Sequence, residues 1–231
     1  MPRELHKVRL DAPANLGPSL ASFYGGSLGL PLTRLDDDGL EIEIGETVLE
    51  FRPVAALPYY HVALLVPGDR FDAALAWVDD RVELLADSET GETVFDFTNW
   101  DARAVYFHDP AGSIVELIAH HGVGAAGTDG AFSPSELIGL SEVGLVCDPP
   151  SLAGALEQEL GLEVWDGTVE GEGRLAFVGE KARTLILCRA GRPWLPTGRP
   201  AEAHPVEVVL AGRANATVPL DAGGSVSVTA S

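Results

Sequence analysis

Val105-Tyr-Phe-His-Asp-Pro-Ala-Gly-Ser-Ile-Val-Glu-Leu117 is the stretch of sequence that decides the fold of this chain. It reads as a strand, a turn at Asp109–Gly112 and a second strand, because proline and glycine supply the backbone angles that a tight turn requires. The second strand, Ser113–Ala119, carries one carboxylate, Glu116, in an otherwise apolar run. A charged residue in such a run marks a position with a special role.

A second copy of this strand lies earlier in the chain. Thr47–Val54 has the same form, with Glu50 in the place of Glu116. Each of the two is preceded in the chain by a strand that opens with a histidine, His6 in one case and His61 in the other. Apolar periodicity predicts a helix in each interval, at Ser19–Leu28 and Phe71–Val78. Each copy therefore reads as one βαβββ unit.

Two further units follow a linker rich in small residues. Glu142–Cys147 reads as the first strand of a third unit, and Leu152–Leu160 as its helix. The segment Asp221–Thr229 follows the pattern of Asp109–Leu117 position by position, which indicates a fourth unit. We therefore predict an α+β fold of tandem βαβββ units that form two half-barrel pairs. The predicted divisions are a first domain at 1–121, a linker at 122–136 and a second domain at 137–231.

The second pair is predicted to be degenerate. Its positions that match the histidines and glutamates of the first pair hold Glu142, Leu187, Val228 and, near the fourth, Pro205. One carboxylate cannot build a metal site alone, so we expect this half to be a structural partner.

The first half can bind a metal ion. Strand side chains alternate between two faces, so a carboxylate within an apolar strand is buried or faces solvent from an edge. A buried carboxylate needs a partner. Two histidines and two glutamates that repeat together can converge on one divalent ion, and we predict His6, Glu50, His61 and Glu116 as its ligands. This donor set suits Zn, Ni, Co, Mn or Fe, and it does not choose among them.

Composition excludes some partners and suggests an environment. The chain has 35 acidic and 15 basic residues and a net charge of −20, so nucleic acid is not expected to bind. The acidic residues are spread along the chain, and Lys7 and Lys181 are its only lysines. This pattern favours a halophilic protein from an acidic proteome over a merely solubilising surface, and a melting temperature that rises in molar KCl would support that interpretation.

No apolar run approaches the roughly 20 residues of a membrane-spanning helix. The start of the sequence lacks the apolar region of a signal peptide, so a cytoplasmic location is expected. Cys147 and Cys188 lie in apolar runs without CxxC spacing and are expected to be buried free thiols.

The paired βαβββ units, with histidine on the first strand and glutamate on the last, resemble the vicinal oxygen chelate superfamily. Its members include glyoxalase I, fosfomycin-resistance enzymes, extradiol dioxygenases, epimerases and bleomycin-resistance proteins. The resemblance implies a metal-dependent lyase or isomerase of the glyoxalase type, which moves a proton on a small metal-chelated substrate. It also implies that Glu50 or Glu116 doubles as the catalytic base. We expect a small-molecule substrate and a monomer or homodimer.

Two other functions stay open within this resemblance. Ring-cleaving dioxygenases use two histidines and one glutamate, and they need a histidine where this chain has Asp96-Phe-Thr-Asn-Trp100. Proteins of the bleomycin-resistance type bind a small molecule without chemistry and commonly lack metal ligands. The four candidate ligands favour an enzyme.

Overall fold

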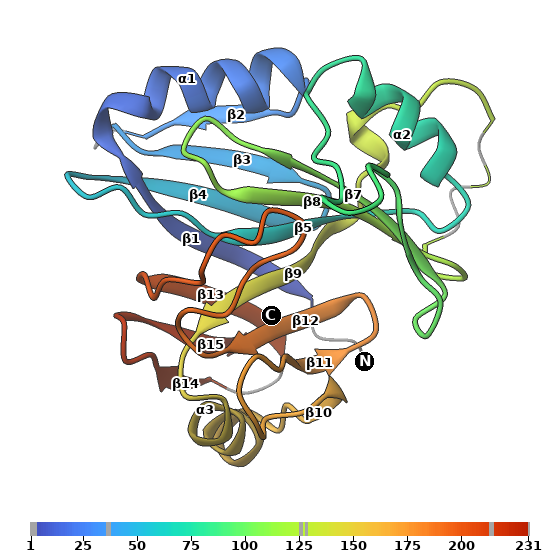
Figure 1. Cartoon of the computed structure of the whole chain (residues 1–231). Coiled ribbons are helices and arrows are strands. Elements are labelled where there is room, and N and C mark those ends of the chain that lie inside the picture. Colours follow the sequence, from blue (N-terminus) through green and yellow to red (C-terminus); the bar gives the residue numbers. More distant parts are fainter. Residues whose placement is uncertain (1–3, 36–37, 125–126, 128, 213–214, 231) are drawn as a thin grey trace.

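The computed structural model describes residues 4–35, 38–124, 127, 129–212 and 215–230. Two mixed sheets and a few helices make an α+β fold (Figure 1), which confirms the predicted fold class. The first sheet has seven strands in the order β14 (Ala216–Pro219), β15 (Gly224–Ala230), β13 (Val206–Gly212), β1 (Leu5–Pro13), β4 (Thr47–Val54), β3 (Leu40–Ile44) and β2 (Leu32–Arg34). The second has eight, in the order β10 (Val164–Gly167), β11 (Ala176–Glu180), β12 (Arg183–Cys188), β9 (Gly139–Val146), β5 (His61–Val66), β8 (Ile114–His120), β7 (Ala102–His108) and β6 (Phe95–Phe97).

The predicted helices are present, two of them with an irregular last turn. The helical segments are η1 (Ala14–Leu16), α1 (Gly17–Ala21), η2 (Ser22–Ser27), α2 (Phe71–Asp79), η3 (Pro134–Glu136), α3 (Pro149–Ala155) and η4 (Leu156–Leu160). The first helix stops before Gly29, whose φ of 71° is a conformation that glycine adopts without strain. Tyr24 of η2 packs on Phe51 of β4, so this helix covers the first sheet.

The units pair across the two sequence halves. In the first sheet β1 of unit one runs antiparallel to β13 of unit four, and in the second sheet β5 of unit two runs antiparallel to β9 of unit three. Each sheet therefore combines strands from 1–121 with strands from 137–231. Each unit leaves the outer edge of its first strand unpaired, and such an edge can be satisfied by any other unit. Local sequence gives no preference for the neighbouring one.

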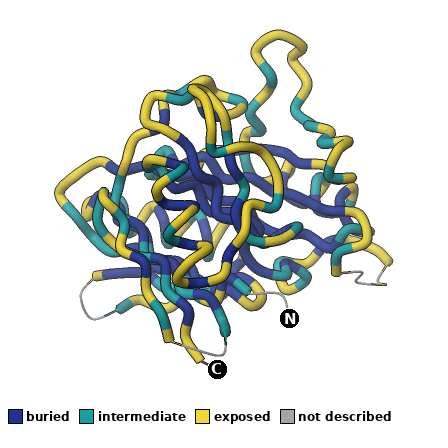
Figure 2. Tube along the Cα trace, turned by 90° about the horizontal axis from the view of Figure 1, so that it is seen from below, coloured by how far each residue is buried: buried dark blue, intermediate teal, exposed yellow. Residues whose placement is uncertain are grey.

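The second sheet has one face on the main apolar core and one face that forms a separate cluster of buried residues. Along β5, Val62 and Leu64 enter the main apolar core, whereas Ala63 joins a second cluster with Tyr106 and Ile186. This division follows from the alternation of side chains along a strand. Figure 2 shows that the burial is concentrated in the strands, while the connecting loops are exposed.

Outside the named strands, Leu84 forms a single antiparallel bridge with Phe107. Cys147 and Cys188 are free, as expected. No helix among the described residues is long and apolar enough to cross a membrane.

Candidate metal centre

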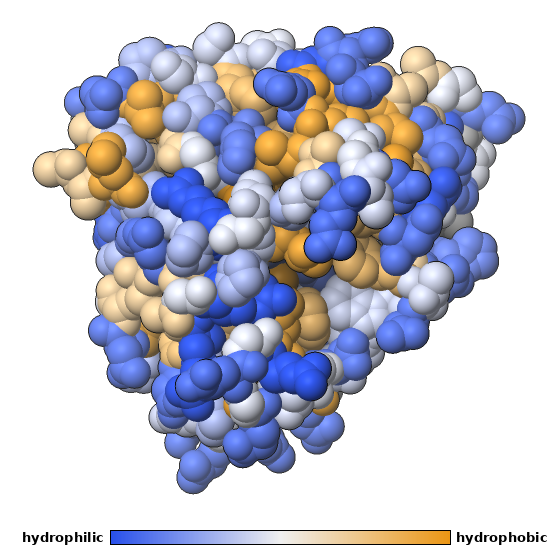
Figure 3. Space-filling model, in the orientation of Figure 1, coloured by the Kyte–Doolittle hydropathy of each residue, from blue (hydrophilic) through white to orange (hydrophobic). Residues whose placement is uncertain are grey.

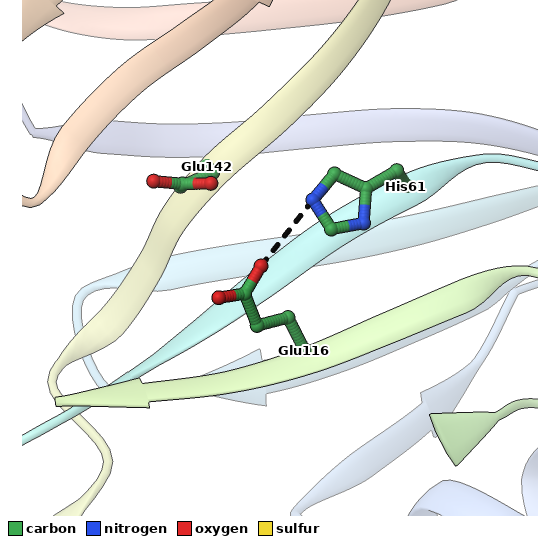
Figure 4. Close-up of side chains that lie close together, drawn as sticks. All are labelled: His61, Glu116 and Glu142. Carbon is green, nitrogen blue, oxygen red and sulfur yellow. Dashed lines mark ion pairs between the residues drawn. The ribbon is translucent and has the colours of Figure 1, made fainter. Parts of the chain in front are cut away.

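Three buried side chains converge on the free face of the second sheet. His61 opens β5, Glu116 lies in β8 and Glu142 in β9, and their donor atoms all lie within 4.8 Å of one another. Figure 4 shows the three groups directed into one space, with His61 Nε2 3.4 Å from Glu116 Oε2. The exposed fractions are 5%, 2% and 3%. We call these three residues the histidine–carboxylate cluster.

Strand register brings the cluster together. Ala63 pairs with Glu116 on one side and with Glu142 on the other, so both carboxylates stand beside it on the same face. His61 lies two residues earlier on the same strand and shares that face. The small side chain of Ala63 leaves the space between the carboxylates open.

A backbone hydrogen bond orients the imidazole. His61 Nδ1 lies 3.2 Å from the carbonyl oxygen of Ile114, which can only accept, so Nδ1 carries the proton. The lone pair of Nε2 then faces the carboxylates. Burial lowers the pKa of His61, although the charge of Glu142 acts in the opposite direction. A neutral imidazole oriented in this way through its other nitrogen is the form that binds metals.

No lysine or arginine of the described residues forms an ion pair with either carboxylate. Burial raises the pKa of both, and the charge of Glu116 raises the pKa of Glu142 further. Tyr106 donates a hydrogen bond to Glu116, which lowers the pKa of that glutamate in part. Among the described residues the only ion pair of either carboxylate is the contact with His61. Two buried carboxylates and one imidazole nitrogen without a protein cation fit a divalent ion such as Zn, Ni, Co, Mn or Fe.

Two of the four predicted ligands lie elsewhere. His6 and Glu50 belong to β1 and β4 of the first sheet, so the structure does not bring them to His61 and Glu116. His6 is exposed. Glu50 is buried, but the Lys7 amino group and the Arg9 guanidinium each lie 2.5 Å from its carboxylate. Protein cations, rather than a metal ion, therefore neutralise the Glu50 carboxylate. The sequence predicts this residue as a metal ligand and as a catalytic base.

Unit one pairs with unit four, which places His6 and Glu50 in the first sheet. A shift of one residue in the repeat also separates His6 from the position that His61 holds. Arg9 pairs with Glu50 and Glu207, as Ala63 pairs with Glu116 and Glu142. The residue two positions before Arg9 is Lys7, so Lys7 and not His6 corresponds to His61. A slip of one residue moves a side chain to the opposite face of the sheet.

The sequence places Glu142 in the predicted degenerate half and does not mark it as a candidate ligand. One signal for Glu142 is present in the sequence. It is a glutamate that opens an apolar strand of unit three, at the position that His61 holds in unit two. The register of β12 against β9 pairs Ile186 with Gly144. Ile186, and not Leu187, therefore holds the position that Glu116 holds in unit two. In the first sheet Ser227, rather than Val228, has this place. The second sheet thus offers three ligands and an apolar fourth position.

The cluster opens onto an apolar pocket of about 420 Å³, a volume that includes the space at its mouth. Its other lining residues are Phe97, Trp100, Tyr106, Leu175, Phe177, Ile186, Arg192, Trp194 and Leu195. The Trp194 ring lies over the His61 ring, with 5.1 Å between centroids. A Cβ on Gly144 would come within 2.9 Å of Trp194, so glycine is required for this approach. Figure 3 shows apolar side chains gathered around a hollow in one face, with hydrophilic ones around them.

No protein-family model matches this chain, and no curated protein matches it. Solved structures match over nearly its full length. A candidate dioxygenase from Bacillus subtilis subsp. subtilis str. 168 is 17% identical, with a TM-score of 0.58 over 98% of this chain and 84% of that one. Glyoxalase I from Zea mays is 12% identical, with a TM-score of 0.55 over 98% of this chain and 92% of that one. A glyoxalase I variant from Zea mays is 12% identical in sequence, with a TM-score of 0.57 over 99% of this chain and 94% of that one. The chain therefore has the fold of the vicinal oxygen chelate superfamily.

Proposed function

We propose that this protein is a metal-dependent enzyme that moves a proton on a small, oxygen-rich substrate. One observation carries the proposal: a buried histidine–carboxylate cluster without a protein cation opens onto an apolar pocket. Burying two carboxylates together is costly without a cation, so the arrangement is suited to binding one. The likeness in fold to glyoxalase I supports the same reaction class.

His61, Glu116 and Glu142 would hold the divalent ion. When bound, such an ion stabilises negative charge that develops on substrate oxygens. Glu142 is the better proton carrier of the two carboxylates. Tyr106 holds Glu116 by a hydrogen bond, whereas no described residue hydrogen-bonds the Glu142 carboxylate. Glu142 therefore takes the role of base for which the sequence suggested Glu50 or Glu116.

The pocket walls support this chemistry by excluding water. Trp194 covers His61 on one side, and Trp100 packs edge-on against Phe177 with 4.5 Å between centroids. A dry, apolar wall strengthens electrostatic interactions between the cluster and a substrate.

The first test separates metal binding from proton transfer. Protein prepared without an affinity tag is loaded with Zn, Ni, Co, Mn or Fe and assayed with hemithioacetals of methylglyoxal and several thiols. We expect one metal per chain, its loss in His61→Ala, and a fall in kcat of roughly 10²–10⁴-fold in Glu142→Gln. Glu207→Gln is the matched control, because Glu207 has the same register in the other sheet. Failure to bind any of these metals, or unchanged turnover in Glu142→Gln, would contradict the proposal.

A second candidate function is ring cleavage by a dioxygenase. The aromatic lining of the pocket favours a ring-shaped substrate. The cluster has one histidine, whereas those enzymes use two. Oxygen uptake by the iron-loaded protein with catechols, without isomerase activity, would favour this reading. Ligand binding without any turnover would instead favour a binding protein of the bleomycin-resistance type.

A further inference from the structure

Arg192 lines the same pocket as the histidine–carboxylate cluster. It lies in the segment between β12 and β13, half-buried, with its guanidinium 5.8 Å from the centroid of the Trp194 ring. The guanidinium therefore borders the same space into which the cluster opens.

Arg192 has no carboxylate partner among the described residues. Its Nε donates to the Gly173 carbonyl at 3.2 Å and its Nη1 to the Pro193 carbonyl at 2.8 Å. These bonds fix the guanidinium plane and leave Nη2 free of them. Six of the other described arginines form ion pairs, namely Arg9, Arg52, Arg70, Arg103, Arg183 and Arg189. Burial lowers the pKa of Arg192, which reflects the cost of its unpaired charge.

The rest of the pocket suits a flat ring. Trp100 and Phe177 meet edge to face, and Trp194 lies over His61. Aromatic side chains favour stacked or edge-on contacts with another ring. An oriented guanidinium in such a pocket pairs with a carboxylate through charge-assisted hydrogen bonds.

We propose that Arg192 is a specificity-determining residue that binds the anionic group of the substrate, and that the substrate is a small aromatic acid. The inference rests on the proposed function only in taking this pocket for the substrate site. The net charge of −20 repels anions in general. A preference for an anion must therefore come from a local cation.

Binding of simple probes tests the inference without turnover. Isothermal titration calorimetry compares benzoate, benzamide and cyclohexanecarboxylate on the metal-free protein and on the zinc-loaded protein. We expect benzoate to bind at least about tenfold more tightly than benzamide in both forms. Cyclohexanecarboxylate should bind several-fold more weakly than benzoate. Arg192→Gln should remove the advantage of benzoate over benzamide and leave the zinc content unchanged.

The matched control is Arg189→Gln. Arg189 lies just before Arg192 in the chain but pairs with Asp148, at 2.6 Å, and does not line the pocket. This variant should keep the preference for benzoate. Equal binding of benzoate and benzamide by the native protein, or a preference that survives in Arg192→Gln, would overturn the inference. Either result would leave the proposed function standing if zinc binding and the effect of Glu142→Gln hold.

Discussion

The two sheets place the same pair of carboxylates at the same register and neutralise them in different ways. In the second sheet Glu116 and Glu142 flank Ala63. In the first sheet Glu50 and Glu207 flank Arg9, with Lys7 at the place of His61. We call Lys7, Arg9, Glu50 and Glu207 the ion-pair cluster.

The ion-pair cluster supplies its own cations. Arg9 lies 2.5 Å from both Glu50 and Glu207, and Lys7 lies 2.5 Å from Glu50. Burial raises the pKa of Glu50, but the hydrogen bonds and charges of Arg9 and Lys7 outweigh this and the net shift is downward. In the histidine–carboxylate cluster burial raises the pKa values of both glutamates, and a neutral imidazole and a methyl group stand in place of the two cations that would oppose this shift.

The two clusters share the same strand register but differ in their cations, so the backbone alone does not make a candidate metal centre. Both sheets present two carboxylates side by side, and the residue between them decides what neutralises the charge. A long cation in that place gives an internal salt bridge, whereas a small residue leaves room for an external ion. Exchange of these residues should convert one arrangement into the other.

The largest effect is expected from Ala63→Arg. The variant places a guanidinium between Glu116 and Glu142, as Arg9 lies between Glu50 and Glu207. Repulsion and lost space should weaken zinc binding by roughly 100-fold or more, equivalent to about 3 kcal/mol. Zinc titration against a competing chelator measures this. Ala63→Met, which is also larger but uncharged, is the control. If both variants lose zinc equally, space and not charge decides the difference.

The reverse exchange should create a second site. In Lys7→His/Arg9→Ala the carboxylates Glu50 and Glu207 lose both cations and gain an imidazole. We expect the zinc content to rise by one equivalent per chain, with a binding constant at least about tenfold weaker than that of the native site because the first-sheet carboxylates are more exposed. Arg9→Ala alone should not bind this second equivalent. Elemental analysis that shows no added zinc in the double variant would refute the equivalence of the two clusters.

A smaller change is expected at the apolar fourth position. Ile186→Glu should add a carboxylate donor, tighten zinc binding about tenfold and lower turnover by taking space that the substrate needs. Ile186→Gln tests the effect of size without charge. Ser227→Glu, at the same position of the other sheet, should leave the zinc affinity unchanged. An affinity that does not respond to Ile186→Glu would show that residue 186 does not face the ion.

The smallest effect concerns pH. The folded pKa of Glu50 is lowered, so its ionised form contributes stability above its ordinary pKa, and this contribution is lost as pH falls through the folded value. Glu50→Gln should therefore flatten the acid side of the stability profile, measured by urea unfolding in a chelator. In the metal-free protein Glu116 should act with the opposite sign, since its folded pKa is raised and its contribution is lost as pH rises. A Glu50→Gln profile parallel to the native one would contradict the ion-pair role.

The sequence by itself determined the repeated units, their helices and the α+β class. It also identified His61 and Glu116, because each of the first two units has a histidine near its first strand and a glutamate in its last strand. Glu142 was visible as a glutamate in an apolar strand, but its partner unit was not. The prediction paired unit two with unit one and therefore chose His6 and Glu50.

Only the tertiary structure decided which units share a sheet and which face each residue takes. The pairing of β5 with β9 depends on hydrogen bonds between open strand edges, and every unit offers such an edge. The face depends on register, where one residue separates Lys7 from His6 and Ile186 from Leu187. Both are properties of contacts between distant segments. That is why the chain's own pattern of residues located two of the three residues of the cluster, and the fold supplied Glu142.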